Sequence, residues 1–347
     1  MNYIGSKLRL SSWIIEIITK EYQKIIPSKS LSETIFAELF AGTGIISRKL
    51  KPYTKQIITN DLEAYSYVLL KNYIGNTKEI PSERIISFME ELNNLSIKNQ
   101  GNTKQNNFVY QNYCEGSGSK RLYFSDDNGK KIDAIRQKIE CWKINKFVSQ
   151  SEYYFLLASL LESADKVANT ASVYGAFLKQ LKKSAQKNLV LSPAHFSATQ
   201  NQENQIFRED ANTLIKKIKG DILYLDPPYN ARQYGANYHL LNTIALYDNF
   251  EPKGKTGLRE YERSKYCQKK EVETVFEELI KNADFKLIFL SYNNEGLMSL
   301  ETIKKIMSKY GAYSLQKTEY QRFKADKDQN REHKANATME YLHILRK

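Results

Sequence analysis

The chain has few of the residues on which disulfide and metal chemistry depend. Its three cysteines, Cys114, Cys141 and Cys267, and its four histidines are scattered through 347 residues. An odd number of widely spaced cysteines does not fit a disulfide framework, and unclustered His and Cys do not fit a zinc site. We therefore expect no bound metal.

Long apolar runs are also lacking. No stretch approaches the roughly 18 consecutive apolar residues of a membrane helix. The first residues, Met1 to Lys7, do not have the apolar core of a signal peptide. We expect a cytoplasmic globular protein that does not associate with a membrane.

Positive charge is abundant. There are 52 Lys and Arg residues against 39 Asp and Glu, which gives a net charge of +13. A basic protein attracts polyanions through its long-range field. A solvated lysine-rich surface would give the same count, so charge indicates a nucleic-acid partner without establishing one.

The first part of the chain shows a strand–loop–helix–strand pattern. A helix is predicted from Ser11 to Ile26, stopping at Pro27. An apolar run over 34–40 predicts a buried strand that ends at Ala41-Gly42-Thr43-Gly44, where a helix opens over 45–50. A second strand over 56–59 ends at Asn60-Asp61. This pattern predicts a parallel α/β sheet.

The pattern breaks over 75–205, which we interpret as an inserted lobe. A polar loop is predicted over 98–107, and helices over 152–164 and 174–185. Further strands are predicted over 221–225 and 286–290, then a helix over 295–310 and two antiparallel strands over 313–323 and 339–346. The predicted catalytic domain is therefore 1–74 plus 206–347, with 75–205 inserted.

The turn at Gly42 and Gly44 is typical of a nucleotide-type site. Glycine lets the backbone approach a ligand, and a helix N-terminus offers unpaired N–H groups. Asp61, after the second strand, has the acceptors to bind ribose hydroxyls. A tight turn and a helix cap would explain these residues equally well. Ser47 stands where a dinucleotide fingerprint has its third glycine, which disfavours an NAD enzyme.

Asp226-Pro227-Pro228-Tyr229 is the stronger signal. It follows a predicted buried strand, at the edge where open α/β sheets bind ligands. An aromatic amine is a poor nucleophile because its lone pair is delocalised. A carboxylate and a carbonyl can accept its two N–H bonds, the prolines fix the loop, and a tyrosine face can stack an extruded base. The loop therefore predicts methyl transfer to a base amine.

The motif order YIGSK, ELFAGTG, ND and DPPY resembles that of the alpha-group (Dam-like) DNA adenine methyltransferases of restriction-modification systems. The resemblance implies a Rossmann-like class I methyltransferase fold, with a mostly parallel seven-stranded sheet and an inserted, mainly helical target-recognition lobe. It implies S-adenosylmethionine as cofactor and double-stranded DNA as substrate, with methylation of the exocyclic amine of a flipped adenine.

The resemblance also implies roles for particular residues. The catalytic loop is Asp226, Pro227, Pro228 and Tyr229. The implied cofactor-binding residues are Tyr3, Lys7, Glu38, Phe40, Gly42, Gly44, Asp61, Asp210 and Asp226. Many members have Glu-Pro-Phe where this chain has Glu38-Leu39-Phe40, a departure that leaves Phe40 and the glycines in place.

Candidate DNA contacts fall in two places. Lys179, Lys182 and Lys183 cluster on the second predicted helix of the lobe and would face phosphates, although a solvated helix face is an equal explanation. Arg232, Gln233 and Tyr234 follow the catalytic loop and are candidates to read bases or fill the gap left by a flipped one. Basic stretches over 253–270 and 322–334 are further candidates, or plain surface loops.

Several alternatives stay open. Cytosine carbon-5 methylation needs a cysteine nucleophile, usually after proline, and there is no Pro-Cys pair. An RNA adenine or guanine base methyltransferase is the main enzyme alternative. A non-catalytic DNA-specificity subunit is the alternative from another class.

No nuclease signature is found, so we expect any cognate restriction endonuclease to act as a separate protein. We expect a monomer or a weak dimer.

Overall fold

The structure is a computed structural model that describes residues 6–97, 107–199, 202–321 and 337–347. It comprises two compact units. The sheet-containing unit has the described residues of 5–62, 201–233 and 262–347, and the helical unit has those of 63–200 and 234–261. Helices α3, α9 and α10 thus belong to the helical unit, whereas the sequence had assigned their residues to the catalytic domain. That the helical unit recognises DNA stays a prediction.

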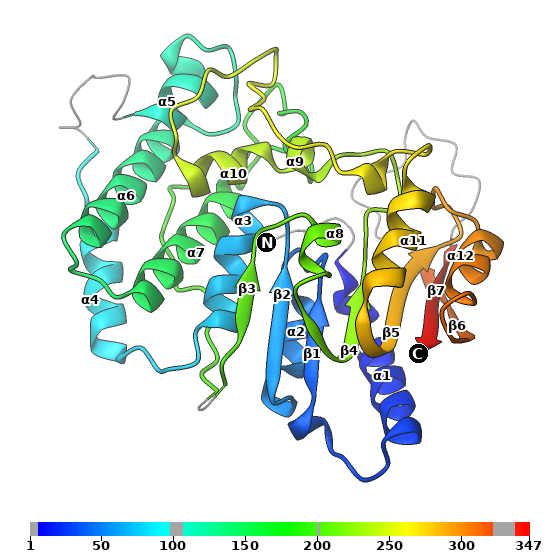
Figure 1. The fold of residues 1–347 in the computed structure, drawn as a ribbon. Helices are drawn as coiled ribbons and strands as arrows, with labels where there is room; N and C mark the ends of the chain where they lie inside the picture. Colours follow the sequence, from blue (N-terminus) through cyan, green and yellow to red (C-terminus); the bar gives the residue numbers. More distant parts are fainter. Residues whose placement is uncertain (1–5, 98–106, 200–201, 322–336) are drawn as a thin grey trace. The chain divides into compact units, whose positions relative to one another are not determined.

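The sheet has seven strands in the order β3-β2-β1-β4-β5-β7-β6 (Figure 1). The first five are parallel, and β7 runs antiparallel to both β5 and β6. This confirms the predicted mostly parallel seven-stranded sheet and its final antiparallel pair. The strands are β1 (Ile35–Glu38), β2 (Gln56–Asn60), β3 (Gln205–Phe207), β4 (Lys219–Leu225), β5 (Asp284–Asn293), β6 (Ala312–Gln321) and β7 (Ala337–Arg346).

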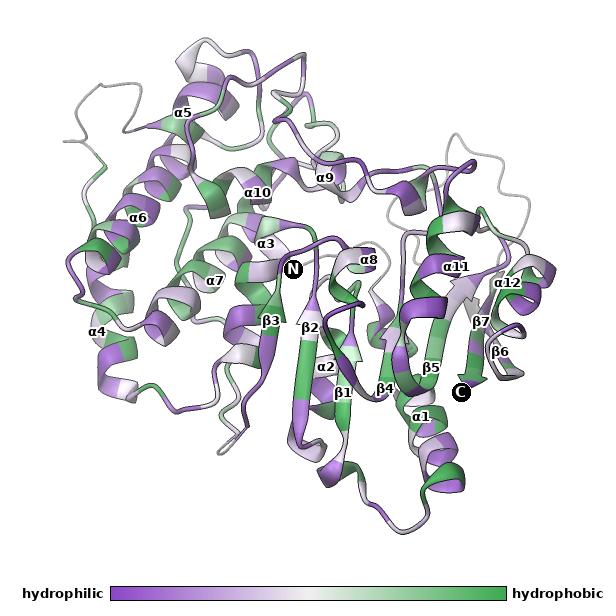
Figure 2. Ribbon diagram, in the orientation of Figure 1, coloured by the Kyte–Doolittle hydropathy of each residue, from purple (hydrophilic) through white to green (hydrophobic). Residues whose placement is uncertain are grey.

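Alternating side chains give the sheet two buried faces. On one face, Leu223, Ile288 and Leu345 join a core with residues of three helices. Figure 2 shows the strands β1, β4 and β5 as largely hydrophobic, as a sheet covered on both faces requires. The helices of this unit are α1 (Ser11–Ile25), α2 (Ile45–Leu50), α8 (Ala211–Leu214), α11 (Val272–Asn282) and α12 (Leu300–Met307), and the 3₁₀ turns are η1 (Lys7–Arg9), η2 (Leu31–Glu33), η3 (Lys51–Tyr53) and η7 (Lys265–Cys267).

The strand order determines where candidate residues gather. In a parallel sheet, the carboxyl ends of neighbouring strands lie along one edge. Strands β3, β2, β1 and β4 are adjacent, and each is followed by a residue singled out from the sequence. Along this edge the structure therefore brings together Asp210, Asp61, the glycine turn and Asp226, which are far apart in the chain.

The helical unit is built around two long helices, α6 and α7. A buried arginine, Arg136 of α6, donates to the carbonyl oxygens of Ile244 and Ala245 at the end of α10. This satisfies two of the four carbonyl groups that a helix end leaves unpaired. The helices are α3 (Ala64–Leu70), α4 (Ser82–Asn93), α5 (Phe108–Tyr113), α6 (Asp126–Ile144), α7 (Gln150–Val167), α9 (Tyr234–Asn237) and α10 (His239–Leu246), with a π-turn η4 (Lys71–Gly75) and a 3₁₀ turn η6 (Glu115–Ser117).

The predicted helix over 174–185 is wrong, because the chain there is irregular. Asn169 holds it in another path. The Asn169 carbonyl accepts from the Leu178 N–H at 3.0 Å, and its side chain accepts from the Lys182 N–H at 3.0 Å. These bonds to a neighbouring segment replace the i to i−4 bonds of a helix. The other predicted lobe helix, over 152–164, is confirmed by α7 (Gln150–Val167).

Two further predictions need correction near the end of the chain. Strand β5 continues to Asn293, and α12 begins only at Leu300, not at Glu295. The intervening turn is held by the Tyr292 hydroxyl, which accepts from the Met298 N–H at 3.3 Å. Helix α11 lies where no helix had been predicted. The predicted loop over 98–106 and the basic stretch over 322–334 lie outside the described residues.

Candidate active site

The glycine turn joins β1 to α2 in a conformation that suits glycine. Gly42 and Gly44 both have positive φ, 54° and 67°. A residue with a Cβ is strained in this region of backbone space. Gly44 is also the N-cap of α2, where it lacks a capping side chain. The N–H of Gly44 donates to the Ala41 carbonyl at 2.7 Å, so the turn is tight, and neither glycine places a side chain at the start of α2.

Glu38, the last residue of β1, is buried and faces this turn. Its carboxylate accepts from the backbone N–H of Ser47 at 3.1 Å and from the Ser47 hydroxyl. Burial raises the pKa of Glu38 to about 8, partly offset by the bonds from Ser47, with Asp226 and Asp61 raising it further. Ser47, which stands where a dinucleotide-binding fingerprint has its third glycine, is thus the hydrogen-bond partner of Glu38.

Asp61 binds the same turn from the end of β2. Its Oδ2 accepts from the Gly42 N–H at 2.7 Å. The preceding residue, Asn60, is 1% exposed and was not predicted from the sequence to have a role. Its amide donates to the carbonyls of Leu39 and Glu209 and accepts from the Glu209 N–H. Asn60 therefore joins the ends of β1, β2 and β3.

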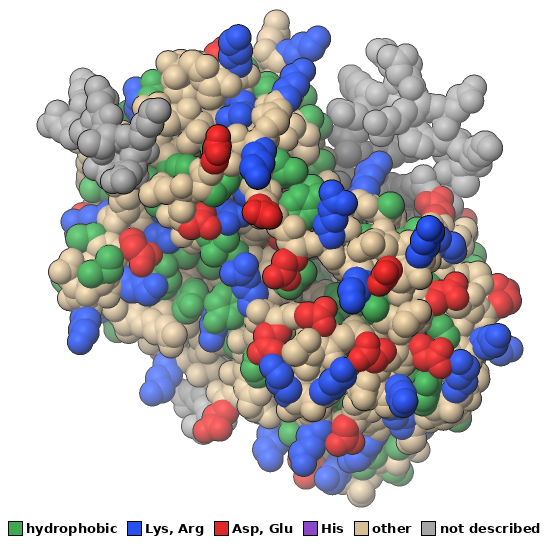
Figure 3. Space-filling model, turned by 45° about the horizontal axis from the view of Figure 1, so that its top comes forward, with side chains coloured by type: hydrophobic (Ala, Val, Ile, Leu, Met, Phe, Trp, Pro, Cys, Tyr) green, Lys and Arg blue, Asp and Glu red, His purple; other side chains and the backbone are tan. Residues whose placement is uncertain are grey.

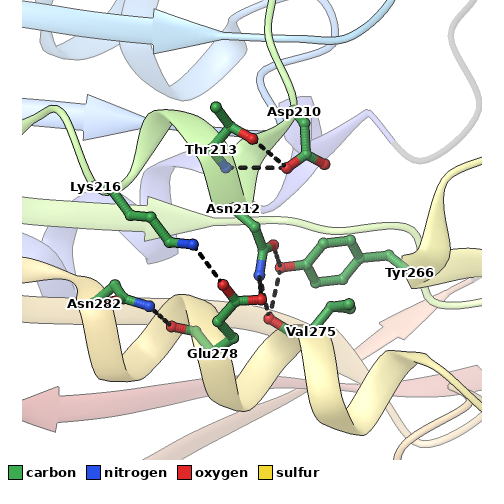
Figure 4. Close-up of polar contacts among 8 residues, drawn as sticks. All are labelled: Asp210, Asn212, Thr213, Lys216, Tyr266, Val275, Glu278 and Asn282. Carbon is green, nitrogen blue, oxygen red and sulfur yellow. Dashed lines mark hydrogen bonds and ion pairs between the residues drawn. The ribbon is translucent and has the colours of Figure 1, made fainter.

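Asp210 follows β3 and caps α8. Its Oδ1 accepts from the Thr213 N–H at 3.0 Å, while the residue is exposed (Figure 4). The next residue but one, Asn212, accepts from the Tyr266 hydroxyl at 2.8 Å. The Tyr266 ring in turn packs edge-on against Phe40, with 4.8 Å between the centroids. Phe40 and Asp210 are thus linked through Tyr266, a residue that the sequence analysis did not single out.

The loop Asp226-Pro227-Pro228-Tyr229 follows β4 directly. The Tyr229 carbonyl accepts from the Leu297 N–H at 2.9 Å, which fixes the end of the loop. The Tyr229 ring lies edge-on to Tyr292 with 6.3 Å between the centroids, and it is only partly buried. Its ring is thus held on one side by protein and retains accessible surface.

The Lys7 ammonium lies between two carboxylates, that of Asp226 in this loop and that of Glu340 in β7. It is 3.3 Å from Asp226 Oδ1 and 3.4 Å from Glu340 Oε1. It also lies 5.7 Å from the centroid of the Tyr229 ring, within the range of a cation–π contact. The predicted role of Lys7 was to hold the cofactor. The structure brings it to the Asp226–Tyr229 loop, together with Glu340, which was not predicted.

The pKa values in this cluster follow from burial and charge. Burial raises the pKa of Asp226 to about 6, Lys7 opposes that rise, and Glu340 adds to it. Burial also raises the pKa of Glu340, again opposed by Lys7. Burial alone would lower the pKa of the Lys7 ammonium, but Asp226 and Glu340 outweigh it and hold the pKa above its usual range.

The three candidate DNA-contact residues after the loop differ in their exposure and in their contacts with the protein. Arg232 is exposed. Both ends of the Gln233 amide are bonded to Ser264, whose N–H it accepts at 2.8 Å and whose carbonyl it donates to at 3.2 Å. Tyr234 opens α9, where its ring stacks on Tyr238 with 6.1 Å between the centroids. Arg232 is therefore the one exposed residue of these three, since Gln233 and Tyr234 are half-buried.

The three lobe lysines do not share a helix face. Lys179 and Lys183 are exposed, whereas the half-buried Lys182 donates to the Thr170 carbonyl at 2.6 Å. On the face shown in Figure 3, the coloured Lys and Arg side chains are interspersed with Asp and Glu. The proposed phosphate contacts thus rest on individual exposed lysines, and a role for these residues stays a prediction.

One predicted cofactor-binding residue lies outside the described part of the chain, and one residue of the site was not predicted. Tyr3 lies outside the described residues. Glu340 had a signal in the sequence, since it is the one acid in the mainly apolar run Met339 to Leu345. In the described ranges, no helix reaches the length and apolarity of a membrane span, and no three His, Cys, Asp or Glu side chains gather as metal ligands.

The chain matches a known protein family over most of its length. Residues 3–306 match the family described as D12 class N6 adenine-specific DNA methyltransferase. This match includes the glycine turn, Asp61 and the Asp226–Tyr229 loop.

Curated relatives agree with this match. The chain is 60% identical to the type II methyltransferase M.NlaIII of Neisseria lactamica over all of this chain and 99% of that protein. It is 41% identical to the type II methyltransferase M.CviAII of Paramecium bursaria Chlorella virus 1, covering 94% and 93% of the two chains. The type II methyltransferase M.FokI of Planomicrobium okeanokoites is 38% identical over all of this chain, which spans 53% of that protein.

Proposed function

This chain belongs to the D12 class N6 adenine-specific DNA methyltransferase family, and we propose that Asp226 to Tyr229 is the loop that binds the amine of the target adenine. The observation that carries this proposal is the contact of Lys7 with Asp226 beside the Tyr229 ring, at the end of β4. The enzyme is an S-adenosylmethionine-dependent transferase.

The residues along the sheet edge fit this cofactor. Gly42 and Gly44, both at positive φ, leave two positions of the turn without side chains, and Asp61 and Asp210 supply carboxylate acceptors after neighbouring strands. Hydroxyl and amino groups of a nucleoside are donors that such acceptors bind. We propose that these four residues, with Phe40, hold S-adenosylmethionine, and that Glu38 holds the turn in shape through Ser47.

When bound, S-adenosylmethionine supplies an electrophilic methyl group, and its transfer leaves a neutral thioether as positive charge passes to the amine nitrogen. Asp226 and the Pro227 carbonyl accept the two N–H bonds of the amine and orient its lone pair. Tyr229 stacks on the adenine after it has flipped out of the duplex. The methylated amine then releases one proton to solvent. Positioning and electrostatics provide the catalysis.

We propose further that the enzyme follows the alpha-group order and is the modification arm of a restriction-modification system. The glycine turn, the helical unit and the Asp226 loop follow one another in that order along the chain. The type II relatives support this biological role. In this proposal the helical unit recognises the DNA sequence, and a cognate endonuclease is a separate protein.

Expression in a host without DNA methylation tests the function directly. Sequencing the host DNA for modified bases is expected to show N6-methyladenine within one short recognition sequence. The Asp226→Ala variant is expected to leave the DNA unmodified while it still binds S-adenosylmethionine in calorimetry. Methylation by this variant at a rate near that of the wild type would disprove the role of the loop.

A further inference from the structure

Glu340 is a buried acid in an apolar strand. It lies on the same face of β7 as Leu342 and Ile344, which are both fully buried, and is itself 6% exposed. In the register of the sheet it is opposite Asn293, at the end of β5. A carboxylate in such surroundings is costly unless it is paired. Its presence therefore calls for an explanation in terms of its partner.

The partner is the Lys7 ammonium, which Glu340 shares with Asp226. One carboxylate oxygen of Glu340, Oε1, lies 3.4 Å from Lys7 Nζ. The other, Oε2, is buried and has no hydrogen-bond partner among the described residues. Two acids from different strands thus contact one cation, and Glu340 is not fully satisfied by that contact.

A second ion pair on the same face of β7 provides a comparison. Arg346 pairs with Glu21 of α1, so the N-terminal segment is attached to β7 at two points. The Glu21 side chain, 5% exposed, is slightly more buried than that of Glu340, at 8%. Only the Lys7 pair touches the catalytic loop. Attachment of the N-terminal segment alone does not explain why Lys7 needs two acids.

Counting charges suggests the reason. Lys7 and Asp226 alone would sum to zero, and the Asp226 carboxylate would be neutralised by the ammonium. With Glu340 ionised, the cluster carries one net negative charge. Positive charge develops on the amine as it is methylated, and a negative site in a low-dielectric setting stabilises that charge.

We propose that Glu340 is a positioning residue that holds and neutralises the Lys7 ammonium, leaving the negative charge of Asp226 available to the target amine. This rests on the proposed role of the Asp226 loop. Glu340 does not contact the reacting atoms; it acts through Lys7. Its contribution is expected in the transition state, and therefore in kcat, with little effect on the KM for DNA.

Glu340→Gln tests this, because it removes the charge with little change in size. Methyl transfer is measured with tritiated S-adenosylmethionine and DNA from a host without adenine methylation. At pH 8 we expect kcat to fall roughly tenfold, the effect of losing one modest transition-state interaction, while the KM for DNA is unchanged.

The pH profile of kcat is the second readout. The titratable groups around Asp226 are Lys7, Glu340, Glu38, Tyr224 and Tyr229. Since Glu340 raises the pKa of Asp226, the acidic limb of the pH profile should move to lower pH in the variant.

Two further variants separate this role from a structural one. Glu21→Gln breaks the second ion pair on the same face and is expected to lower the melting temperature without moving kcat or the acidic limb. Glu340→Asp keeps the charge on a shorter side chain and is expected to lie between wild type and Glu340→Gln in kcat. Should the Gln variant fail to fold, wild-type kcat in Glu340→Asp overturns the positioning role, because that role requires the carboxylate to reach Lys7.

The outcomes are distinguishable. Wild-type kcat and an unmoved acidic limb in the folded Glu340→Gln variant overturn the inference, as does equal impairment by Glu21→Gln. Asp226→Ala is assayed alongside. If that variant methylates adenine, the proposed function fails; if it is inactive while Glu340→Gln behaves as wild type, only the role of Glu340 fails.

Discussion

The carboxylate of Asp61 accepts a hydrogen bond from the backbone N–H of Gly42 at 2.7 Å. The residue at the end of β2 thus contacts the glycine turn that follows β1. This bond raises a question about Asp61 itself, because a carboxylate that shapes the turn and a carboxylate that binds the ribose would both affect cofactor affinity.

Two substitutions of Asp61 separate these roles. Asp61→Asn keeps an oxygen that can accept from Gly42 but loses the charge and one acceptor, whereas Asp61→Ala loses all of them. If Asp61 binds the ribose, both variants should lose affinity for S-adenosylmethionine, by about tenfold or more in Kd for Asp61→Ala. Isothermal titration calorimetry measures this. Full affinity in Asp61→Asn would restrict Asp61 to shaping the turn, and full affinity in Asp61→Ala would remove it from the site.

The rate of methylation should depend on pH through Asp226. Burial raises the pKa of this carboxyl to about 6 from the ordinary 3.8. The ionised carboxylate is a stronger acceptor for the amine N–H than the protonated acid, so activity should be full above this pKa and be lost as the pH falls through it. The quantity to measure is kcat/KM between pH 5 and 9, which reports the free enzyme. A flat profile down to pH 5 would contradict ionisation of Asp226 as the requirement.

Glu38 should make stability depend on pH in the opposite sense to an acid whose pKa is lowered by an ion pair. Its pKa is about 8 in the folded chain and 4.5 as the ordinary value. Between these values the folded state keeps a proton that the unfolded state releases. The free energy of unfolding should therefore fall as the pH rises from about 4.5 to 8. Glu38→Gln, which has no proton to lose, should flatten this part of the curve.

Urea unfolding at pH 5, 6.5 and 8 measures the Glu38 effect. Ser47→Ala is the matched control, because it removes the hydroxyl bond to Glu38 but keeps the carboxyl. Since that bond lowers the pKa of Glu38, the control should show the same pH dependence or a wider one. Parallel curves for wild type and Glu38→Gln would show that Glu38 does not titrate as described.

The lobe lysines should divide into two kinds. Lys179→Ala and Lys183→Ala remove exposed charges and are expected to weaken DNA binding, each reducing the slope of log K against log salt by about one. Lys182→Ala instead removes a bond to the Thr170 carbonyl and is expected to cost about 1 kcal/mol of stability with little change in the slope. Fluorescence anisotropy with a labelled duplex at several salt concentrations tests both. Unchanged slopes in the first two variants would exclude them from the DNA contact.

The sheet could be predicted from the sequence because its signals are local. Short apolar runs bounded by glycine or by acids identified β1, β2 and β4, and the motifs at their ends follow from the way parallel strands align. The irregular segment over 174–185 has no such local signal. Its path depends on bonds from Asn169, so a helical pattern of side chains was overridden by tertiary contacts.

The candidate site could be predicted only where its residues lie at the end of a strand that the sequence reveals. Asp61 and Asp226 each end a strand, which local patterns reveal. Asn60 and Glu340 contact partners on segments far away in the sequence. Lys7 and Glu340 are 333 positions apart, and no spacing rule relates them, because an antiparallel register between the last strands decides which residue of β7 reaches the N-terminal segment.

The separation of Lys7 from Glu340 also bears on how the enzyme is made. The glycine turn and Asp226 are synthesised well before β7, and parallel strands β1 to β5 can pair without it. The cluster around Lys7, however, is completed only when β7 inserts between β5 and β6. Long-range contacts of this kind form late and slowly. A chain in which β7 has not yet inserted would therefore lack a finished catalytic centre, so that methylating competence depends on one of the slower steps of folding.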